Sequence, residues 1–205
     1  MKLQITYNFS DITQALEIAN HTAEHADILG IGSLLIYKNG VESIKKFKSL
    51  FPSHEIFIEI PIFEKAQDTV ALFAKAGASY VSVLAGASHS TIKKTIETAK
   101  NYDIKIALDL LDAHSHGQSA HDAKTLGVDL VIIHRTVTTQ DGSDYITEWQ
   151  NVRENTKLPV FVTGKIDRVN IQQIIDLKPQ GIIIGAAIIK ADNPAQEAKY
   201  FKSLM

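Results

Sequence analysis

Two glutamates and a proline stand at the end of one strand-like segment, where side chains can do chemistry. In EIFIEIPIFEKA these are Glu59, Pro61 and Glu64, with no basic residue between the glutamates. Side chains alternate along an extended strand, so Glu59 and Pro61 share one side. A carboxylate that points into a protein there needs a cation, a metal ion or hydrogen-bond donors. We expect Glu59 and Glu64 to be catalytic. The alternatives are that Glu59 pairs with a buried cation and that Glu64 caps the first turn of the following helix, where the helix dipole favours a negative charge.

The elements that must position these residues form a regular series. Short apolar segments recur along the chain, namely LQITYN, ADILGIG, EIFIEIP, SYVSVLAG, KIALDLL, DLVIIHR, PVFVTG and GIIIGAA. Segments with helical spacing and polar faces, such as DITQALEIANHTAEHA, lie between them. Helix start signals stand at Asp11, at Ser88 or Ser90, and at Asn193 before Pro194. The series therefore predicts strands that alternate with helices.

Strands that alternate with helices imply right-handed crossovers and a parallel sheet. Eight such units in 205 residues favour the α/β class and a closed (β/α)8 TIM barrel, with a doubly wound open sheet as the alternative. No linker or change of composition interrupts the series. We therefore expect one (β/α)8 barrel domain over residues 1–205.

The composition restricts the expected partners and location. The 21 basic and 23 acidic residues give a formal net charge of −2, and no long basic run occurs. We therefore expect no nucleic-acid partner, no membrane partner, and a small soluble ligand. The chain has no cysteine and does not begin with an apolar stretch typical of a secretory signal, which favours a cytoplasmic protein.

In a TIM barrel, the carboxyl ends of the strands and the loops after them form the active face. The residues at these positions are Asn8, Gly30, Gly32, Ser33, Glu59, Pro61, Glu64, Gly86, Ser88, Asp109, Asp112, His134, Arg135, Thr163, Gly164, Lys165, Gly185, Ala186 and Ala187. Asp109 is a candidate because an inward carboxylate without a purpose is costly. For His134 a ligand contact and a hydrogen-bonded histidine at the barrel mouth are both open. Lys165 either adds charge to a phosphate site or is a solvated loop lysine.

The stretch DAHSHGQSAHDAK carries three histidines, His114, His116 and His121. Their spacing lacks the regular His-x-x-x-His of a metal site on one helical face. We expect instead that Asp112 or Ser115 caps a helix there.

Several segments, in chain order, resemble a known family. MKLQ, ADILGIGSLLI, AGASYVSVLAGAS, IALDLL, VIIHR, VFVTG and IIIGAAIIKADNPAQEAKYFKS are similar to 3-hexulose-6-phosphate synthase and 3-keto-L-gulonate-6-phosphate decarboxylase, members of the orotidine-5′-phosphate decarboxylase group. The resemblance covers essentially the whole chain. It implies a (β/α)8 barrel, a homodimer with active sites at the subunit interface, and a phosphorylated sugar or nucleotide-like ligand.

The resemblance also shows where this chain departs from the family pattern. The family motif Asp-x-Lys-x-x-Asp reads Glu59-x-Pro61-x-x-Glu64 here, so the lysine that serves the reacting centre is absent. The sugar-phosphate branch holds Mg²⁺ through the first motif residue and a glutamate of strand two, which is Gly30 here. Mg²⁺ at Glu59 is the corresponding expectation. The aspartate that closes strand one is Asn8.

Other positions keep the residue types of the family. Asp109 and His134 match an acidic residue and a histidine that handle substrate hydroxyls or protons. The second basic residue of the decarboxylase branch falls on Val137, which counts against that branch. The resemblance places substrate or phosphate contacts at Asn8, Ser33, Gln140, Thr163, Gly164, Lys165, Gly185, Ala186 and Ala187.

Two functions follow as hypotheses. The first is an aldol-type lyase that forms or cleaves a ketose phosphate through Glu59, Glu64, Asp109 and His134, with a carboxy-lyase as its variant. Such chemistry passes through an enediolate, which needs an electrophile. The second is a catalytically inactive or regulatory protein that binds a phosphorylated ligand. Proline has no proton to donate, and the carboxylate lost at Gly30 leaves one protein ligand fewer for Mg²⁺, so both departures favour this second hypothesis.

Overall fold

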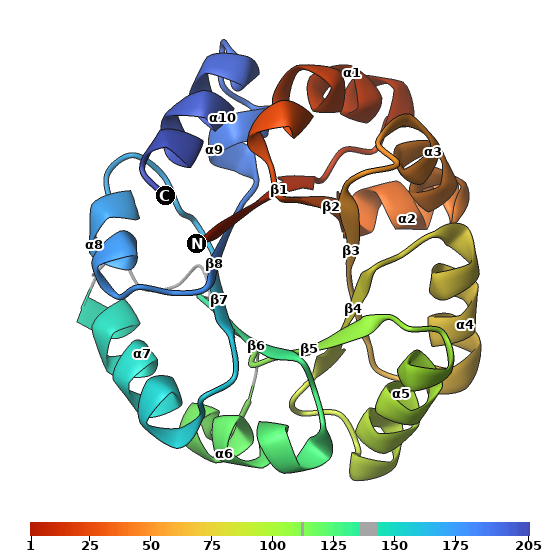
Figure 1. Ribbon diagram of the computed structural model, residues 1–205, viewed down its shortest axis with the longest axis vertical. Coiled ribbons are helices and arrows are strands. Elements are labelled where there is room, and N and C mark those ends of the chain that lie inside the picture. Colours follow the sequence, from red (N-terminus) through yellow and green to blue (C-terminus); the bar gives the residue numbers. More distant parts are fainter. Residues whose placement is uncertain (112, 136–142) are drawn as a thin grey trace.

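Within the residues that the computed structural model describes, 1–111, 113–135 and 143–205, eight parallel strands form a closed ring (Figure 1). The strands are β1 (Lys2–Tyr7), β2 (Ile28–Gly32), β3 (Glu55–Ile62), β4 (Tyr80–Leu84), β5 (Lys105–Asp109), β6 (Leu130–His134), β7 (Val160–Thr163) and β8 (Gly181–Ile184). Each pairs with its neighbours in chain order, and β8 pairs with β1. This closure confirms the predicted (β/α)8 barrel and excludes the doubly wound open sheet.

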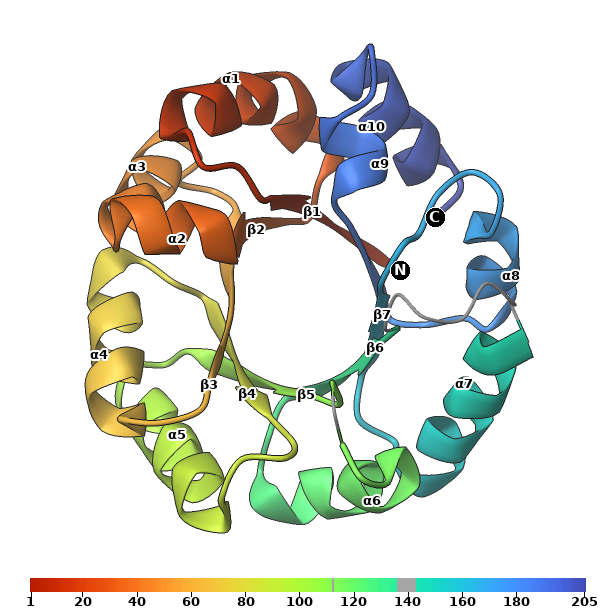
Figure 2. The same ribbon diagram turned by 180° about the vertical axis from the view of Figure 1, so that it is seen from behind.

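Helices cover the outside of the ring all round, as Figure 1 and the opposite view in Figure 2 both show. They are α1 (Ile12–Thr22), the 3₁₀ helix η1 (Ala23–His25), α2 (Ser33–Asn39), α3 (Glu42–Leu50), α4 (Ala66–Ala76), α5 (His89–Asn101), α6 (His116–Leu126), α7 (Ser143–Asn155), α8 (Ile171–Asp176), α9 (Ala186–Ile189) and α10 (Pro194–Ser203). None in the described part of the chain is both long and apolar enough to span a bilayer.

The helix starts follow the expected capping chemistry. The side chains of Asp11, Ser88, Ser115 and Asn193 each accept a hydrogen bond from a backbone N–H group in the first turn of the next helix. Ser88 is therefore the cap of α5, and Ser115 is the cap of α6. Asp112, the other residue considered for that cap, lies outside the described residues.

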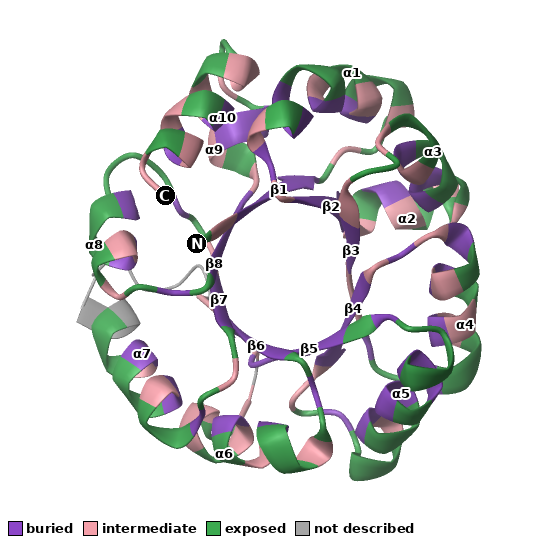
Figure 3. Ribbon diagram, in the orientation of Figure 1, coloured by how far each residue is buried: buried purple, intermediate pink, exposed green. Residues whose placement is uncertain are grey.

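Two apolar layers arise from the alternation of side chains along the strands. One layer packs against the helices, and the buried ring of strands in Figure 3 lies between that layer and the barrel interior. The interior is filled by Ile28, Phe57, Tyr80, Ala107, Leu130, Ile132, Phe161 and Ile183. Two residues further along the same strands, the inward positions are Gly30, Glu59, Ser82, Asp109 and His134. The same alternation of side chains that fills the barrel interior therefore also places polar groups at the carboxyl ends of the strands.

Pro61 coincides with an irregularity in the sheet. The register between β3 and β4 shifts between Ile58 and Ile62. Proline has no N–H group to donate to a neighbouring strand, so it is tolerated where a ladder is interrupted. The interruption lies directly beside Glu59.

A cluster of charges closes the amino-terminal end of the barrel. The Glu55 carboxylate accepts hydrogen bonds from Lys2 Nζ at 2.6 Å, Lys105 Nζ at 2.9 Å and the Tyr80 hydroxyl at 3.2 Å. Burial acts to raise the pKa of Glu55, but the hydrogen bonds from the two lysines outweigh it, and the pKa is lowered. This face opposes the site and serves stability.

Candidate active site

Two adjoining cavities lie at the carboxyl ends of the strands. The inner cavity, of about 270 Å³, is bounded by polar groups from β3 to β6 over the apolar interior. The loop cavity, of about 660 Å³, lies among the segments that follow β1, β7 and β8. Glu59, Thr163 and Ile183 line both cavities. A ligand that occupies both must therefore pass Glu59.

Glu59 reaches from β3 toward β1. Its Oε1 atom accepts hydrogen bonds from Gln4 Nε2 at 2.6 Å and from the Thr6 hydroxyl. Burial raises the pKa of Glu59, although these two hydrogen bonds and the nearby His134 act to lower it. A carboxyl group with a raised pKa at a cavity wall is suited to give and take protons.

Asp109 and His134 face one another across β5 and β6. Asp109 Oδ2 lies 3.4 Å from His134 Nδ1, and Asp109 Oδ1 accepts a hydrogen bond from the Leu111 N–H group at 2.9 Å. Asp109 is only 5% exposed, whereas His134 is half-buried in the cavity wall. The carboxylate favours the tautomer that carries its proton on Nδ1, which leaves the lone pair on Nε2.

The loop cavity gathers the residues expected to bind phosphate. Asn8, Thr163, Gly164, Lys165, Gly185, Ala186 and Ala187 all line it, and Lys190 adds a second lysine. Gly164 has φ 106°, and a Cβ atom there would lie 2.5 Å from the Arg135 carbonyl oxygen, so this position requires glycine. Lys165 follows with φ 45°, an uncommon conformation for a residue with a side chain.

The remaining expected residues lie in three different places. Ser33, the first residue of α2, lines the inner cavity, and so does Pro61. Glu64 is exposed in the loop before α4 and lines neither cavity. Lys65, rather than Glu64, is the N-cap of that helix. Gln140 and Val137 lie outside the described residues.

Sequence reasoning missed several residues of the two cavities. Gln4 and Thr6 bind the carboxylate of Glu59, Ser82 and Tyr37 line the inner cavity, and Lys190 lines the loop cavity. Ser82 could have been predicted from the alternation of side chains along β4, because it stands two residues after the interior residue Tyr80. The other four become visible only when neighbouring strands and loops are placed side by side.

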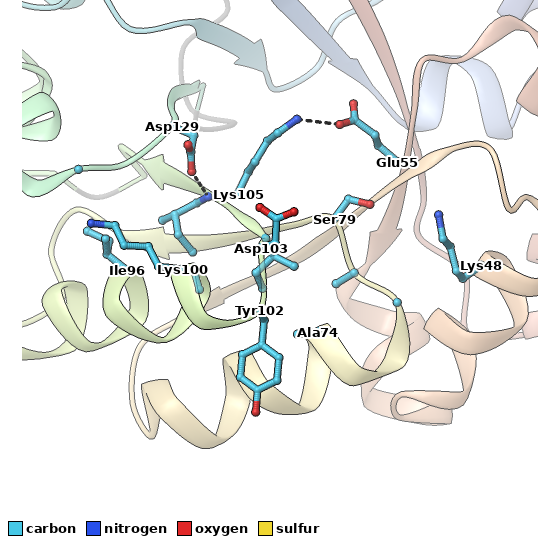
Figure 4. Close-up of a pocket in the computed structure, with 16 residues that line it drawn as sticks. Lys48, Glu55, Ala74, Ser79, Ile96, Lys100, Tyr102, Asp103, Lys105 and Asp129 are labelled. Atoms are coloured by element: carbon cyan, nitrogen blue, oxygen red, sulfur yellow. Dashed lines mark hydrogen bonds and ion pairs between the residues drawn. The ribbon is translucent and has the colours of Figure 1, made fainter.

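A further groove, of about 770 Å³, opens on the opposite face of the barrel (Figure 4). The helices α4, α5 and α6 end beside it, where a positive charge is favoured by the helix dipole, and Lys48, Lys100 and Lys105 line it. Lys48 Nζ donates to the carbonyl oxygens of Pro52 and His54, and Lys105 pairs with Glu55. These lysines are explained by the fold.

Comparisons with known proteins show the family of the chain. Residues 1–201 match the Orotidine 5'-phosphate decarboxylase / HUMPS family, and the chain belongs to that family. It is 25% identical over 207 residues to 3-hexulose-6-phosphate synthase of Bacillus subtilis, covering 100% of this chain and 99% of the relative. A 3-hexulose-6-phosphate synthase of Staphylococcus aureus is 26% identical over 203 residues, covering 97% of this chain and 96% of the relative.

Solved structures show the same likeness. A crystal structure of 3-hexulose-6-phosphate synthase superposes with a TM-score of 0.92 at 25% identity, over 100% of both chains. KGPDC from Streptococcus mutans gives a TM-score of 0.88 at 20% identity, over 99% of this chain and 96% of the other, and supports the fold. The chain is thus a sugar-phosphate-lyase-like TIM barrel that resembles 3-hexulose-6-phosphate synthase.

Proposed function

We propose that this protein is an aldol-type lyase that forms or cleaves a ketose phosphate. The observation that carries the proposal is the meeting of Glu59, Asp109 and His134 in one small cavity that adjoins a second, larger cavity among the loops. The names of its relatives, which are 3-hexulose-6-phosphate synthases, support the same substrate class.

The loop cavity is the place proposed for the phosphate group. Backbone N–H groups at Gly185, Ala186 and Ala187 suit an anion, as the loops after the last two strands of such barrels commonly do. Lys165 and Lys190 are exposed at its rim and add positive charge. The phosphate would then anchor the sugar while its carbonyl end lies in the inner cavity.

The inner cavity is the place proposed for the reaction. In aldol cleavage a base removes the proton of the hydroxyl group, the adjacent carbon–carbon bond breaks, and its electron pair passes into the carbonyl as an enediolate, which is then protonated. Glu59 and His134 are the two groups placed to act as base and acid, and Asp109 orients the imidazole. Hydrogen bonds to the developing oxyanion would come from the same polar wall.

The Mg²⁺ ion that the resemblance implies does not fit the residues present. Mg²⁺ needs oxygen ligands in near-octahedral geometry, and Gly30 offers no side chain beside Glu59. Among the described residues there is no group of three histidine or acidic side chains that could hold a metal ion. No step of the proposed reaction therefore passes through magnesium.

Thermal unfolding and turnover with the same ligands test the function. Ribulose 5-phosphate, 3-keto-L-gulonate 6-phosphate and inorganic phosphate would each be added, with and without Mg²⁺, and turnover would be followed with the sugar phosphates. Selective stabilisation by one sugar phosphate, with turnover strongly lowered by Asp109→Asn, is the expected result. Stabilisation by every phosphate without turnover of any would refute the lyase.

A binding or regulatory role is the second candidate, and Pro61 and Gly30 favour it. Compared with the family pattern, Pro61 removes a proton donor from the cavity wall, and Gly30 removes a carboxylate. In that case the thermal midpoint would still rise with ligand concentration, as expected for a ligand that binds only the folded state, while turnover stays absent.

We also propose that the protein is a cytoplasmic homodimer. Tyr37 and Phe63 are 75% and 63% exposed near the mouth of the barrel, and Glu64 follows Phe63. Large exposed apolar side chains beside a site are suited to a partner surface. Sedimentation of the purified protein would give the dimer mass, and Phe63→Ser would shift it toward the monomer; a monomer at every concentration would refute the assembly.

A further inference from the structure

Three polar atoms converge on the space over Gly30, the third residue of β2. A Cβ atom at Gly30 would lie 2.6 Å from Glu59 Oε1, 2.9 Å from Thr6 Oγ1 and 3.0 Å from Gln4 Nε2. Real Cβ atoms essentially never lie closer than 3.0 Å to another heavy atom, so a side chain at this position would displace the Glu59 carboxylate. Glu59 therefore occupies space that only a glycine leaves open.

The donors that hold this carboxylate are neutral. Gln4 is fully buried on β1, and its Nε2 atom donates to Glu59 Oε1 at 2.6 Å, beside the hydroxyl of Thr6. The Oε1 atom of Gln4 is buried and has no hydrogen-bond partner within the part of the chain that the structure describes. If the amide were turned over, this oxygen would face the carboxylate oxygen. The unsatisfied oxygen thus shows that Glu59 sets the direction of the amide.

Two other oxygen-bearing side chains at the mouth, Asp109 and Asn8, are already engaged. Asp109 accepts from the Leu111 N–H group and faces His134, and Asn8 Oδ1 accepts from the Leu34 N–H group at 3.0 Å. A divalent cation bound at Oε1 of Glu59 would have to displace the two donors on that atom and would lie near their hydrogen atoms. The Oε1 atom of the carboxylate is thus satisfied by two neutral donors of the protein itself.

We propose that Gly30, Gln4 and Thr6 form a neutral cradle that fixes the Glu59 carboxylate in place of a divalent cation. Gln4 and Thr6 are positioning residues, since they act through Glu59. The inference concerns the free protein and holds for a lyase and for a binding protein alike. It can therefore fail or succeed independently of the proposed function.

Titration of the wild-type protein with Mn²⁺, followed by its paramagnetic resonance signal, tests the absence of a cation site directly. The signal of free Mn²⁺ should remain undiminished at millimolar concentration, and Mg²⁺ and a chelator should give the same thermal midpoint. One bound Mn²⁺ per chain that disappears in Glu59→Gln would overturn the proposal. This measurement requires no ligand and no turnover.

Crystal structures of two variants test the cradle. In Gly30→Ala the carboxylate of Glu59 should move away from Gln4 and Thr6. An unmoved carboxylate would contradict the claim that it occupies space that only a glycine leaves open. Thr6→Val keeps the shape of the side chain and should lower the thermal midpoint, with rescue by Thr6→Ser. Its matched control is Thr95→Val, a buried threonine of α5 whose hydroxyl donates to the Thr91 carbonyl. Equal losses in the two valine variants would mean that Thr6 does not hold Glu59.

Discussion

The Nδ1 atom of His134 lies 3.4 Å from the Oδ2 atom of Asp109, and the two residues end neighbouring strands. Asp109 also accepts a hydrogen bond from the backbone two residues later, so its carboxylate is held from both sides. The pair therefore links a fixed, buried carboxylate to an imidazole in a cavity wall. This relationship is the part of the site most directly suited to proton transfer.

The first prediction concerns a substitution that removes the charge that orients this imidazole. Asp109→Asn should lower turnover of a sugar phosphate by about a hundredfold or more, because the amide no longer favours the Nδ1 tautomer. Steady-state kinetics would measure the loss, and ligand-induced thermal shifts should stay close to those of the wild type. A variant with full turnover would show that the pair has no part in the reaction.

The second prediction concerns the stability cost of Glu59. Its folded-state pKa is raised above the ordinary value of 4.5, so the folded protein holds this proton more tightly than the unfolded chain does. Its contribution to stability is therefore complete below pH 4.5 and is lost as the pH rises through the folded-state pKa. Glu59→Gln should be more stable than the wild type at neutral pH and should lose any turnover.

Urea unfolding of both proteins across this pH range checks the sign. The advantage of Glu59→Gln should grow from acidic to neutral pH, and each kcal/mol gained would raise the thermal midpoint by about 2–4 °C. An advantage that shrinks as the pH rises would contradict a raised pKa.

The third prediction separates backbone strain from charge at the loop cavity. Lys165→Gly should match or exceed wild-type stability, by up to about 1 kcal/mol, because glycine accepts positive φ without strain. It should also weaken phosphate binding by about tenfold, the equivalent of about 1.4 kcal/mol. Calorimetric titration with inorganic phosphate would measure the affinity.

Lys178→Gly is the matched control for this variant. Lys178 has φ 57°, stands two residues after the last residue of α8 and lines neither cavity, so its replacement relieves similar strain. The control should gain similar stability and leave phosphate affinity unchanged. Equal affinities for Lys165→Gly and the wild type would remove Lys165 from the phosphate site.

The fourth prediction uses the opposite end of the barrel. The pKa of Glu55 is lowered, so its contribution is present above the ordinary value of 4.5 and is lost as the pH falls through the folded-state pKa. Glu55→Gln should cost about 1 kcal/mol of stability at neutral pH, since the ion pairs are partly exposed, and less in acid. Turnover measured below the unfolding temperature should not change, and a strong loss would mean that this face takes part in function.

The fold was predictable because each strand repeats the same local chemistry. Capping residues such as Asp11 and Ser88 act within one helical turn, so their positions can be read without the tertiary structure. Barrel closure depends on the pairing of β1 with β8, which joins residues from the two ends of the chain. The strand count favoured closure, but only the pairing excludes an open sheet.

The candidate site was predictable where a strand end determines it. Asp109 and His134 follow interior residues by two positions, and alternation alone directs them inward. The partners of Glu59 were not predictable in this way, because its side chain turns toward β1 across the space over Gly30. That direction depends on three neighbouring strands and on an atom that glycine lacks.

The two cavities share Glu59, Thr163 and Ile183, and this sharing makes the barrel mouth selective for the length of the ligand. A phosphate anchored among the loops fixes one end of an open-chain sugar, so the number of carbon atoms decides which bond comes to rest beside Glu59. A sugar phosphate with one carbon atom fewer would place a different carbon–carbon bond beside the same Glu59 carboxyl group. Selectivity among sugar phosphates would then follow from spacing along the chain, even where every hydroxyl group found a partner.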